Sequence, residues 1–397
     1  MYDFPPAVIS FSKTDREGYP MKRFFAICCL CALALTLPVR AAGPEVNAPS
    51  AVLMEKSTGT VLCAKDEHTP REPASVTKVM TILLTMEAID SGAISYDDVV
   101  TGSAHASSMG GSQIWLREGE QMTVRDLLKA VCVVSGNDAA VALGEYLAGS
   151  EDAFVEKMNA RAQELGMLDT HFVNATGLPA AGHVTSAYDI ALMSRELILN
   201  HPDIRQFTTI WMDSLRDGES MLVNTNKLVR FYDGATGLKT GSTDSAGYCL
   251  SATAERNGME LIAVVMKGKT SDERFADARA LLDYGFATYA LVTVAPDAAL
   301  APLPVVLGER GAVQPVLTKE NTLLLEKSAA GGLQKEVALP ESVPAPIAEG
   351  DRLGELRVTD AAGETVAVLP ILAGESVAHV TWAQMFRRVL RLAFCAP

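Results

Sequence analysis

The chain has 397 residues, of which 48% are apolar and 21% charged, and its formal net charge is −14. This length is sufficient for two domains with sizeable cores. The negative charge argues against nucleic acid as a partner, because binding to phosphates needs clustered lysine and arginine.

The N-terminal part predicts an exported protein. Residues 21–42 begin with two basic residues, continue with a short apolar run and end in small residues. This is the pattern of a secretory signal peptide, with cleavage after Ala41 or Ala42. The apolar run is too short for a comfortable membrane span, although an uncleaved N-terminal anchor is the alternative. Residues 1–20 match no targeting pattern, so we expect translation to start at Met21.

The next part of the chain predicts two strands and then a block of helices. Residues 50–68 predict a pair of strands with a turn at Ser57-Thr58-Gly59. Residues 73–92 predict a helix that is apolar on nearly all sides and is therefore buried. Residues 123–148 predict two helices with Thr123 as N-cap and an interruption at Ser-Gly-Asn. Two further helices are expected over residues 151–165 and 186–200.

Strands return after residue 221. Residues 236–268 read as strand, turn, strand, with Asn257-Gly258 as a hairpin signal. A helix over residues 273–286 follows. Strands at both ends of a helical block predict one mixed sheet with helices packed on it, which is an α+β fold. Residues 291–375 lack helical periodicity and predict a separate small β-rich domain.

Three short motifs are candidates for chemistry: Ser75-Val76-Thr77-Lys78, Ser135-Gly136-Asn137 and Lys239-Thr240-Gly241. Each is weak alone, since Ser-x-x-Lys should occur about once by chance in such a chain. A second copy indeed occurs at Ser10 and Lys13, in the leader. The copy at Ser75 differs because it opens the helix that is predicted to be buried.

The spacing of Ser75 and Lys78 suits nucleophilic catalysis. A serine hydroxyl is a poor nucleophile until a base takes its proton. Three residues apart on a helix, the two side chains share one face, and burial lowers the pKa of a lysine so that it can act as that base. The helix N-terminus also favours developing negative charge. The alternative is a surface serine and lysine in the first turn of a helix.

The other two motifs also have ordinary explanations. Ser135 and Asn137 lie in a loop, where polar side chains often satisfy local backbone. Lys239 lies on an expected strand and could belong to a solvated face. Gly241 on that strand would allow a ligand to approach the backbone closely. The three motifs gain weight together, since they follow one another at intervals of 60 and 104 residues.

This order and spacing resemble the serine penicillin-recognising enzymes. Residues 45–290 are similar to the low-molecular-weight D-alanyl-D-alanine carboxypeptidases, peptidase family S11. The similarity extends over REPASVTKVMT, VRDLLKAVCVVSGNDAAVAL, THFVNATGLPAAGHVTSAYDIALMSREL and GLKTGSTDSAGYCLSATA. It implies a penicillin-binding, β-lactamase-like transpeptidase fold and a role in cell-wall remodelling.

The resemblance implies a role for each motif residue. Ser75 would be the acyl-enzyme nucleophile and Lys78 its general base. Ser135 would relay a proton between Lys78 and the leaving D-alanine, and Asn137 would hold the substrate's peptide amide. The substrate would be a peptidoglycan stem peptide that ends in D-Ala-D-Ala, and β-lactam antibiotics would acylate the same serine.

The resemblance also implies how a carboxylate-ended substrate is bound. Lys239 and Thr240, followed by Gly241, would bind the terminal carboxylate. Arg274, 35 residues beyond Lys239, resembles the family's further carboxylate partner. The oxyanion hole would be the backbone N–H groups of Ser75 and Ser242.

Metal and cofactor chemistry are not expected. The six histidines are scattered and none belongs to a His-Glu-x-x-His helix. His183 either orders a loop near the site or is an exposed loop residue. Cys132 and Cys249 lie in apolar runs, so we expect buried free thiols rather than a disulfide or a zinc site.

Two rival functions stay open. A class A β-lactamase carries the same three motifs and a Glu-x-x-Leu-Asn string, which occurs here at Glu196–Asn200. Here the string falls inside a predicted helix, 43 residues before Lys239, so we interpret it as coincidence. A non-catalytic β-lactam or muropeptide receptor is the second rival, although such sensors usually join several membrane spans.

The C-terminal residues 380–394 predict a basic amphipathic helix. Its apolar face would carry Trp382, Met385, Phe386, Val389, Leu392 and Ala393, opposite Gln384, Arg387, Arg388 and Arg391. Such a helix suits an anionic membrane surface, and a helix docked on the protein is the alternative. We therefore expect an exported enzyme anchored at the outer face of the cytoplasmic membrane. The expected divisions are a leader (1–42), a carboxypeptidase domain (43–290), a β-rich domain (291–375) and an anchor helix (376–397).

Overall fold

The structure is a computed structural model that describes residues 43–318 and 321–394. The predicted signal peptide, its cleavage after Ala41 or Ala42 and the start at Met21 lie outside these residues. In the part of the chain that is described, no helix is long and apolar enough to cross a membrane.

The centre of the larger domain is a five-stranded sheet with the order β2-β1-β9-β8-β7. All four pairings are antiparallel rather than mixed as predicted. Short turns connect β1 and β2, β7 and β8, and β8 and β9, which makes these three pairs antiparallel. The expected hairpin at Asn257-Gly258 joins β8 to β9, and both residues have positive φ. A further turn at residues 244–246 makes three strands where two were expected. The strands are β1 (Ser50–Glu55), β2 (Val61–Lys65), β7 (Ala235–Thr243), β8 (Gly247–Arg256) and β9 (Met259–Gly268).

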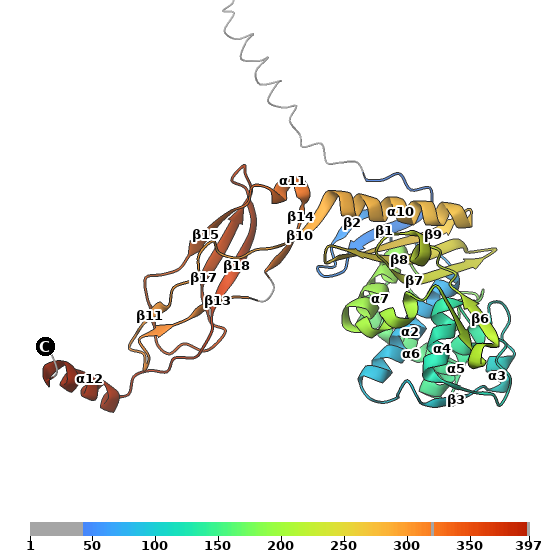
Figure 1. The fold of residues 1–397 in the computed structure, drawn as a ribbon, viewed down its shortest axis with the longest axis horizontal. Coiled ribbons are helices and arrows are strands. Elements are labelled where there is room, and N and C mark those ends of the chain that lie inside the picture. The colour runs from blue at the N-terminus through green and yellow to red at the C-terminus, as the bar shows by residue number, and fades with distance from the viewer. Residues whose placement is uncertain (1–42, 319–320, 395–397) are drawn as a thin grey trace, which may run out of the picture. The chain divides into compact units, whose positions relative to one another are not determined.

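Helices cover both faces of this sheet (Figure 1). Side chains of a strand alternate between its faces, so Leu261 and Val265 of β9 pack with α10 (Ser271–Thr288) in one apolar cluster. Ile262 and Val264 pack on the opposite face in a second cluster, together with the helical block. Burial on both faces explains why β9 reads as a continuous apolar run rather than as an alternating pattern.

The helical block surrounds one buried helix. A 3-10 turn, η1 (Ala74–Thr77), leads into α2 (Lys78–Asp90), whose residues are mostly buried, as predicted for residues 73–92. The expected pair of helices over residues 123–148 is confirmed, and Thr123 accepts a hydrogen bond from the backbone N–H of Asp126 as N-cap. The helices around α2 are α4 (Val124–Val133), α5 (Asn137–Ala148), α6 (Glu151–Glu164) and α7 (Ala187–Asn200).

Short elements complete this domain. Two small two-stranded sheets, β3–β4 and β5–β6, lie outside the central sheet. The elements are β3 (Val99–Thr101), α3 (Ala104–Ser107), β4 (Gln121–Thr123), η2 (Pro202–Ile204), α8 (Arg205–Thr208), β5 (Met212–Leu215), η3 (Arg216–Gly218), β6 (Ser220–Val223) and α9 (Leu228–Phe231).

The C-terminal part is β-rich, which confirms that element of the predicted fold class. Among the described residues its strands form a four-stranded sheet (β13-β18-β17-β15), a three-stranded sheet (β12-β11-β16) and the pair β10-β14. Buried side chains such as Leu356 and Ile371 form apolar clusters of their own in this part. The elements are β10 (Tyr289–Thr293), β11 (Leu303–Val306), β12 (Ala312–Val313), β13 (Pro315–Leu317), β14 (Thr322–Glu326), α11 (Lys327–Ala330), β15 (Gln334–Ala338), β16 (Val343–Pro344), β17 (Arg352–Thr359), β18 (Thr365–Ala373) and α12 (Trp382–Phe394).

Candidate active site

Ser75 and Lys78 lie together at the start of the buried helix. Ser75 is half-buried in η1, and Lys78, the first residue of α2, is fully buried. Lys78 Nζ donates a hydrogen bond to Ser75 Oγ at 2.9 Å. A surface serine and lysine are therefore excluded, and the geometry is that of a nucleophile beside its base.

The surroundings of Lys78 disfavour its protonated form. Burial lowers its pKa well below the ordinary value, and the positive charge of Lys239 lowers it further, while Asp138 acts in the opposite direction. Besides Ser75, the ammonium group donates to Asn137 Oδ1 (2.6 Å) and to the backbone oxygen of Thr176 (2.8 Å). Three acceptors hold the Lys78 amine in place, and its lowered pKa allows it to exchange a proton with Ser75.

Ser135 and Asn137 lie between α4 and α5. The backbone of Ser135 has a φ of +66°, and its buried hydroxyl has no hydrogen-bond partner among the described residues. Asn137 opens α5, and its Nδ2 donates to the backbone oxygen of Gly110 at 2.6 Å. The unpartnered hydroxyl of Ser135 leaves it available for a ligand, since buried polar groups are normally satisfied.

The third motif lies on β7, an edge strand of the central sheet. Lys239 Nζ donates to the backbone oxygen of Thr240 at 2.9 Å, and Thr240 Oγ1 donates to Thr225 Oγ1 at 2.8 Å. Burial, followed by the positive charge of Arg274, lowers the pKa of Lys239 to about 7. An edge strand leaves one row of backbone groups open to pair with an extended peptide.

Gly241 brings β7 into contact with the nucleophile segment. A Cβ at this position would lie 2.8 Å from the backbone oxygen of Pro73 and from the backbone nitrogen of Ser75. Only glycine permits this approach. The close neighbour is the protein's own nucleophile segment, whereas the sequence predicts the approach of a ligand. Ser242, the next residue on β7, is exposed.

Arg274, on α10, forms a hydrogen bond with β7. Its Nη1 donates to the backbone oxygens of Gly241 (3.0 Å) and Cys249 (3.2 Å), so it contacts β7 and β8. Its Nε has no partner among the described residues, and burial lowers the pKa of the guanidinium to about 10. The contact with β7 places its positive charge next to the Lys-Thr-Gly motif.

His183 orders the loop beside the site, so the first of its two expected alternatives is confirmed. The backbone N–H of Val173 donates to Nδ1 at 2.9 Å, and Nε2 lies 2.8 Å from Thr77 Oγ1. Because Nδ1 accepts, the neutral ring carries its proton on Nε2. Burial and the neighbouring His171 lower the pKa of His183 to about 4.

Sequence reasoning missed Thr176, whose backbone oxygen is one of the three acceptors of Lys78. The residues Asn174-Ala-Thr-Gly177 are typical of a turn. Every residue has a backbone oxygen, however, so residue type does not show which one accepts from Lys78.

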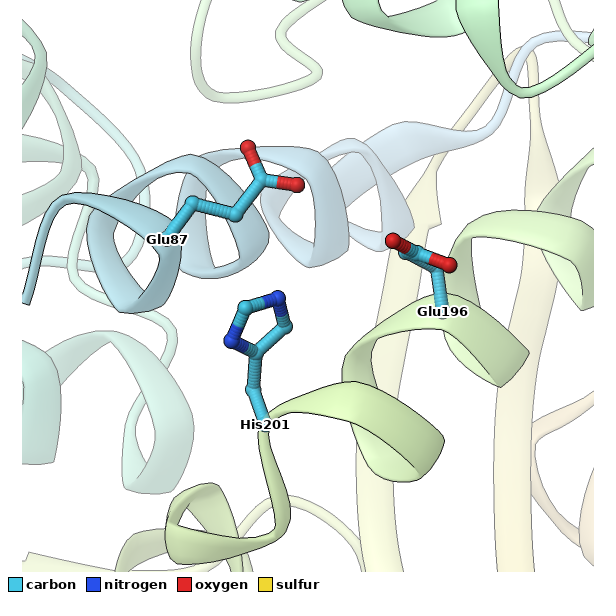
Figure 2. Close-up of side chains that lie close together, drawn as sticks. All are labelled: Glu87, Glu196 and His201. Carbon is cyan, nitrogen blue, oxygen red and sulfur yellow. The ribbon is translucent and has the colours of Figure 1, made fainter. Parts of the chain in front are cut away.

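Glu196, in the string shared with β-lactamases, belongs to a different cluster. It lies on α7 as expected, near Glu87 and His201, in an arrangement that could hold a metal ion (Figure 2). Arg161 pairs with both carboxylates, at 2.7 Å from Glu87 and 2.6 Å from Glu196. Arg161 therefore bridges the two carboxylates, and their contacts form an ion-pair network that joins α2, α6 and α7.

Cys132 and Cys249 are buried free thiols, as predicted. Burial raises the pKa of Cys132 to about 12 and that of Cys249 to about 11, so both stay protonated and unreactive.

Family comparison agrees with this geometry. Residues 38–270 match the D-alanyl-D-alanine carboxypeptidases of peptidase family S11, and residues 293–379 match the C-terminal domain of penicillin-binding protein 5. The chain is 42% identical over 349 residues to the D-alanyl-D-alanine carboxypeptidase DacF of Bacillus subtilis, which covers 87% of this chain and 89% of that protein. It is 34% identical over 368 residues to DacD of Escherichia coli, covering 90% of this chain and 92% of that protein.

Solved structures give the same result. Penicillin-binding protein 5 of Haemophilus influenzae superposes with a TM-score of 0.74 at 29% identity, covering 85% of this chain and 99% of that one. Penicillin-binding protein D2 of Listeria monocytogenes, in its ampicillin-bound form, superposes with a TM-score of 0.56 at 34% identity, covering 61% of this chain and 98% of that one. The chain therefore belongs to the D-alanyl-D-alanine carboxypeptidases of peptidase family S11.

Proposed function

We propose that this serine-type carboxypeptidase removes the terminal D-alanine of peptidoglycan stem pentapeptides through an acyl-enzyme on Ser75. The observation that carries the proposal is the 2.9 Å contact between Ser75 Oγ and the buried amine of Lys78. Ser75 Oγ attacks the carbonyl carbon of the penultimate residue while Lys78 takes the hydroxyl proton. The tetrahedral intermediate then expels D-alanine, and its nitrogen receives a proton through the hydroxyl of Ser135. Water hydrolyses the ester in a second step and restores Ser75.

The same proposal gives the binding residues their tasks. The substrate's terminal carboxylate binds Lys239 and Thr240, with the charge of Arg274 behind them on α10. Asn137 holds the peptide amide, and the backbone N–H groups of Ser75 and Ser242 stabilise the oxyanion. Loss of one oxyanion donor typically costs about 100- to 1,000-fold in rate. No step needs a metal or cofactor, because the base and the electrostatic stabilisers are protein groups.

β-Lactam antibiotics are the second class of ligand in this proposal. A β-lactam carbonyl next to a carboxylate offers the same two groups as the peptide, and ampicillin is bound in the Listeria relative. We expect the penicilloyl-enzyme to be hydrolysed slowly. Glu196 pairs with Arg161 and is not among the hydrogen-bond partners of Lys78 Nζ, so it is not placed to activate a water molecule there. Rapid catalytic hydrolysis of penicillin would instead favour a β-lactamase.

One experiment distinguishes a carboxypeptidase from a non-catalytic receptor. Purified protein is incubated with a stem pentapeptide and released D-alanine is measured, with Ser75→Ala as control. Mass spectrometry after labelling with benzylpenicillin locates the adduct. We expect D-alanine release that disappears in the variant, and a single penicilloyl group on Ser75. A protein that binds penicillin at Ser75 but releases no D-alanine would be a receptor, and activity that survives Ser75→Ala would reject the assignment.

We further propose that α12 anchors the enzyme at the outer face of the cytoplasmic membrane. Its apolar side chains are largely exposed, with Trp382 at 84%, Phe386 at 52% and Phe394 at 81%. The rings of Trp382 and Phe386 stack with centroids 6.0 Å apart. Arg388 donates to the backbone oxygens of Gly308 (3.2 Å) and Glu309 (2.5 Å), so one arginine ties α12 to the β-rich part. The exposed aromatic face beside the other arginines favours an anionic lipid surface. In this proposal the β-rich residues 291–375 form a spacer between residues 43–290 and the anchor helix of residues 376–397.

A further inference from the structure

A tight turn at residues 174–178, here called the 176 turn, supplies the backbone acceptor of Lys78. Asn174 Oδ1 accepts hydrogen bonds from the backbone N–H groups of Thr176 (3.1 Å) and Gly177 (2.7 Å), and Asn174 Nδ2 donates to the backbone oxygen of Leu178 (2.9 Å). These contacts fix the shape of the turn. They do not fix its place relative to Lys78, because all of them are internal to the turn.

The 176 turn lies directly against the segment that carries the nucleophile. A Cβ on Gly177 would lie 1.8 Å from the backbone oxygen of Ala74, next to Ser75 in the chain. On the other side, Thr81 Oγ1 donates to the backbone oxygen of Ala175 at 2.8 Å. A displacement of the turn would therefore be transmitted to both Ser75 and Lys78.

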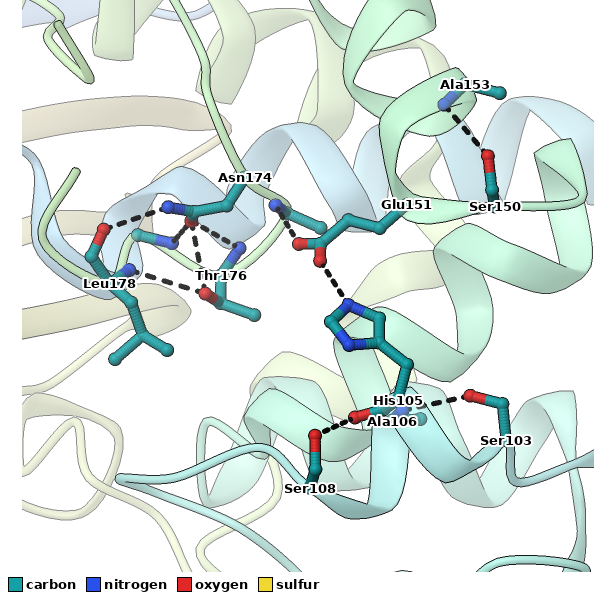
Figure 3. A network of polar contacts seen from close by, with 12 residues as sticks. Ser103, His105, Ala106, Ser108, Ser150, Glu151, Ala153, Asn174, Thr176 and Leu178 are labelled. Atoms are coloured by element: carbon teal, nitrogen blue, oxygen red, sulfur yellow. Dashed lines mark hydrogen bonds and ion pairs between the residues drawn. The ribbon is translucent and has the colours of Figure 1, made fainter. Parts of the chain in front are cut away.

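Glu151 holds this turn from outside the active site (Figure 3). It is the first residue of α6, and its Oε1 accepts a hydrogen bond from the backbone N–H of Ala175 at 2.9 Å. Its Oε2 lies 2.7 Å from Nε2 of His105 on α3. The Glu151 side chain is only 15% exposed, whereas the His105 side chain is 49% exposed, so water screens the contact with Ala175 less than the contact with His105. One side chain thus connects the 176 turn to α3.

α3 in turn leads into the loop that orients Asn137. Ser103 caps α3 by accepting from the backbone N–H of Ala106. After α3, the backbone oxygens of Gly110 and Ser112 accept from Asn137 Nδ2 (2.6 Å) and from its backbone N–H (2.7 Å). Asn137 and Thr176 are two of the three acceptors of the Lys78 ammonium group. Both segments that Glu151 connects therefore contribute to the placement of Lys78.

We propose that Glu151 is a positioning residue for acylation, whose carboxylate holds the 176 turn and α3 together and so sets the approach of Lys78 Nζ to Ser75 Oγ. Oε1 of Glu151 accepts from the 176 turn and Oε2 accepts from α3, so this carboxylate links two segments through its two oxygens. The inference rests on the proposed roles of Ser75 and Lys78.

The test compares Glu151→Ala and Glu151→Gln in the full chain, with Asp152→Ala as a matched control. Asp152 is the next residue of α6, is exposed, and carries the same charge in the same first turn. It therefore controls for loss of negative charge at the helix N-terminus. D-alanine release and acylation by benzylpenicillin are measured at the same pH for all variants.

We expect Glu151→Ala to lower kcat and the acylation rate about tenfold with little change in KM, because misplacement of a catalytic group by a fraction of an ångström costs about this much. Glutamine keeps an oxygen for Ala175 N–H and places an amide N–H beside Nε2 of His105, so it should restore kcat to within about threefold of the wild type. His105→Ala, which breaks only the α3 arm, should cost about threefold in kcat. Asp152→Ala should keep the wild-type kcat and KM.

An unchanged kcat in Glu151→Ala, a loss confined to KM, or a glutamine variant as slow as the alanine variant would each overturn the proposal. If Glu151→Ala does not fold, His105→Ala decides, because its half-exposed side chain can be removed with little loss of packing, and an unchanged kcat there would overturn it. Activity that survives Ser75→Ala would reject the proposed function itself. Activity lost in Ser75→Ala but retained in Glu151→Ala would reject only the positioning role.

Discussion

Gly241→Ala is the substitution whose effect follows most directly from the geometry. The added Cβ would lie 2.8 Å from the backbone nitrogen of Ser75 and from the backbone oxygen of Pro73, and 2.9 Å from the backbone nitrogen of Val76. All three atoms are backbone, so no side chain can rotate away. Ordinary contact begins near 3.4 Å, so β7 and the nucleophile segment must separate by about 0.6 Å. Since about 1 Å of misplacement costs about 100-fold, we expect at least a tenfold loss in the rate of acylation.

The assay is the second-order rate constant for labelling by a fluorescent penicillin, together with the melting temperature. Gly311→Ala is the control, because a Cβ at Gly311 would meet no atom within 4 Å. We expect Gly311→Ala to label at the wild-type rate. Wild-type labelling by Gly241→Ala would refute the reasoning, since it would mean that β7 can move away from Ser75 without cost.

Three further outcomes are expected. First, kcat/KM should fall above about pH 7 as Lys239, with its pKa of about 7, loses the charge that binds the substrate carboxylate. Lys239→Arg should move this alkaline limb upward, and an unmoved limb would contradict this assignment. Second, the pKa of His183 is lowered to about 4, so the unfolded chain binds that proton first as the pH falls. The free energy of unfolding in urea should therefore be fully retained above about pH 6.5 and decrease by about 3 kcal/mol towards pH 4, and the same decrease in His183→Asn would argue against this origin. Third, truncation before Ser376 should release active enzyme from anionic vesicles, with unchanged kcat; a truncated protein that still sediments with vesicles would show that the anchor lies elsewhere.

Several predictions about the elements were confirmed because local sequence determines them. The turn residues Asn257-Gly258 place the hairpin between β8 and β9, and Thr123 caps α4. The apolar run of α2 predicts its burial. The break between α4 and α5 follows from Ser135-Gly136-Asn137, whose residues disfavour a continuous helix.

Other features of the structure differ from what the sequence predicts. The sequence predicts one strand where the structure has β7 and β8, separated by a turn at residues 244–246. The helix that was expected to begin at residue 73 starts with a 3-10 turn at Ala74–Thr77. The first feature depends on strand pairing, and a strand's pairing partner is set by contacts far away in the sequence.

The amino-acid sequence by itself determined the α+β class, the three motifs and their order, because each depends on residue type and on spacing along the chain. Only the tertiary structure decided which groups meet: Lys78 with the backbone oxygen of Thr176, Gly241 with the backbone of Ser75, and Glu151 with both Ala175 and His105. The physical reason is that most of these contacts involve backbone atoms, which every residue possesses. Apart from the glycine that the close approach at position 241 requires, such contacts leave no residue-specific signal in the sequence, and they arise only when distant segments pack together.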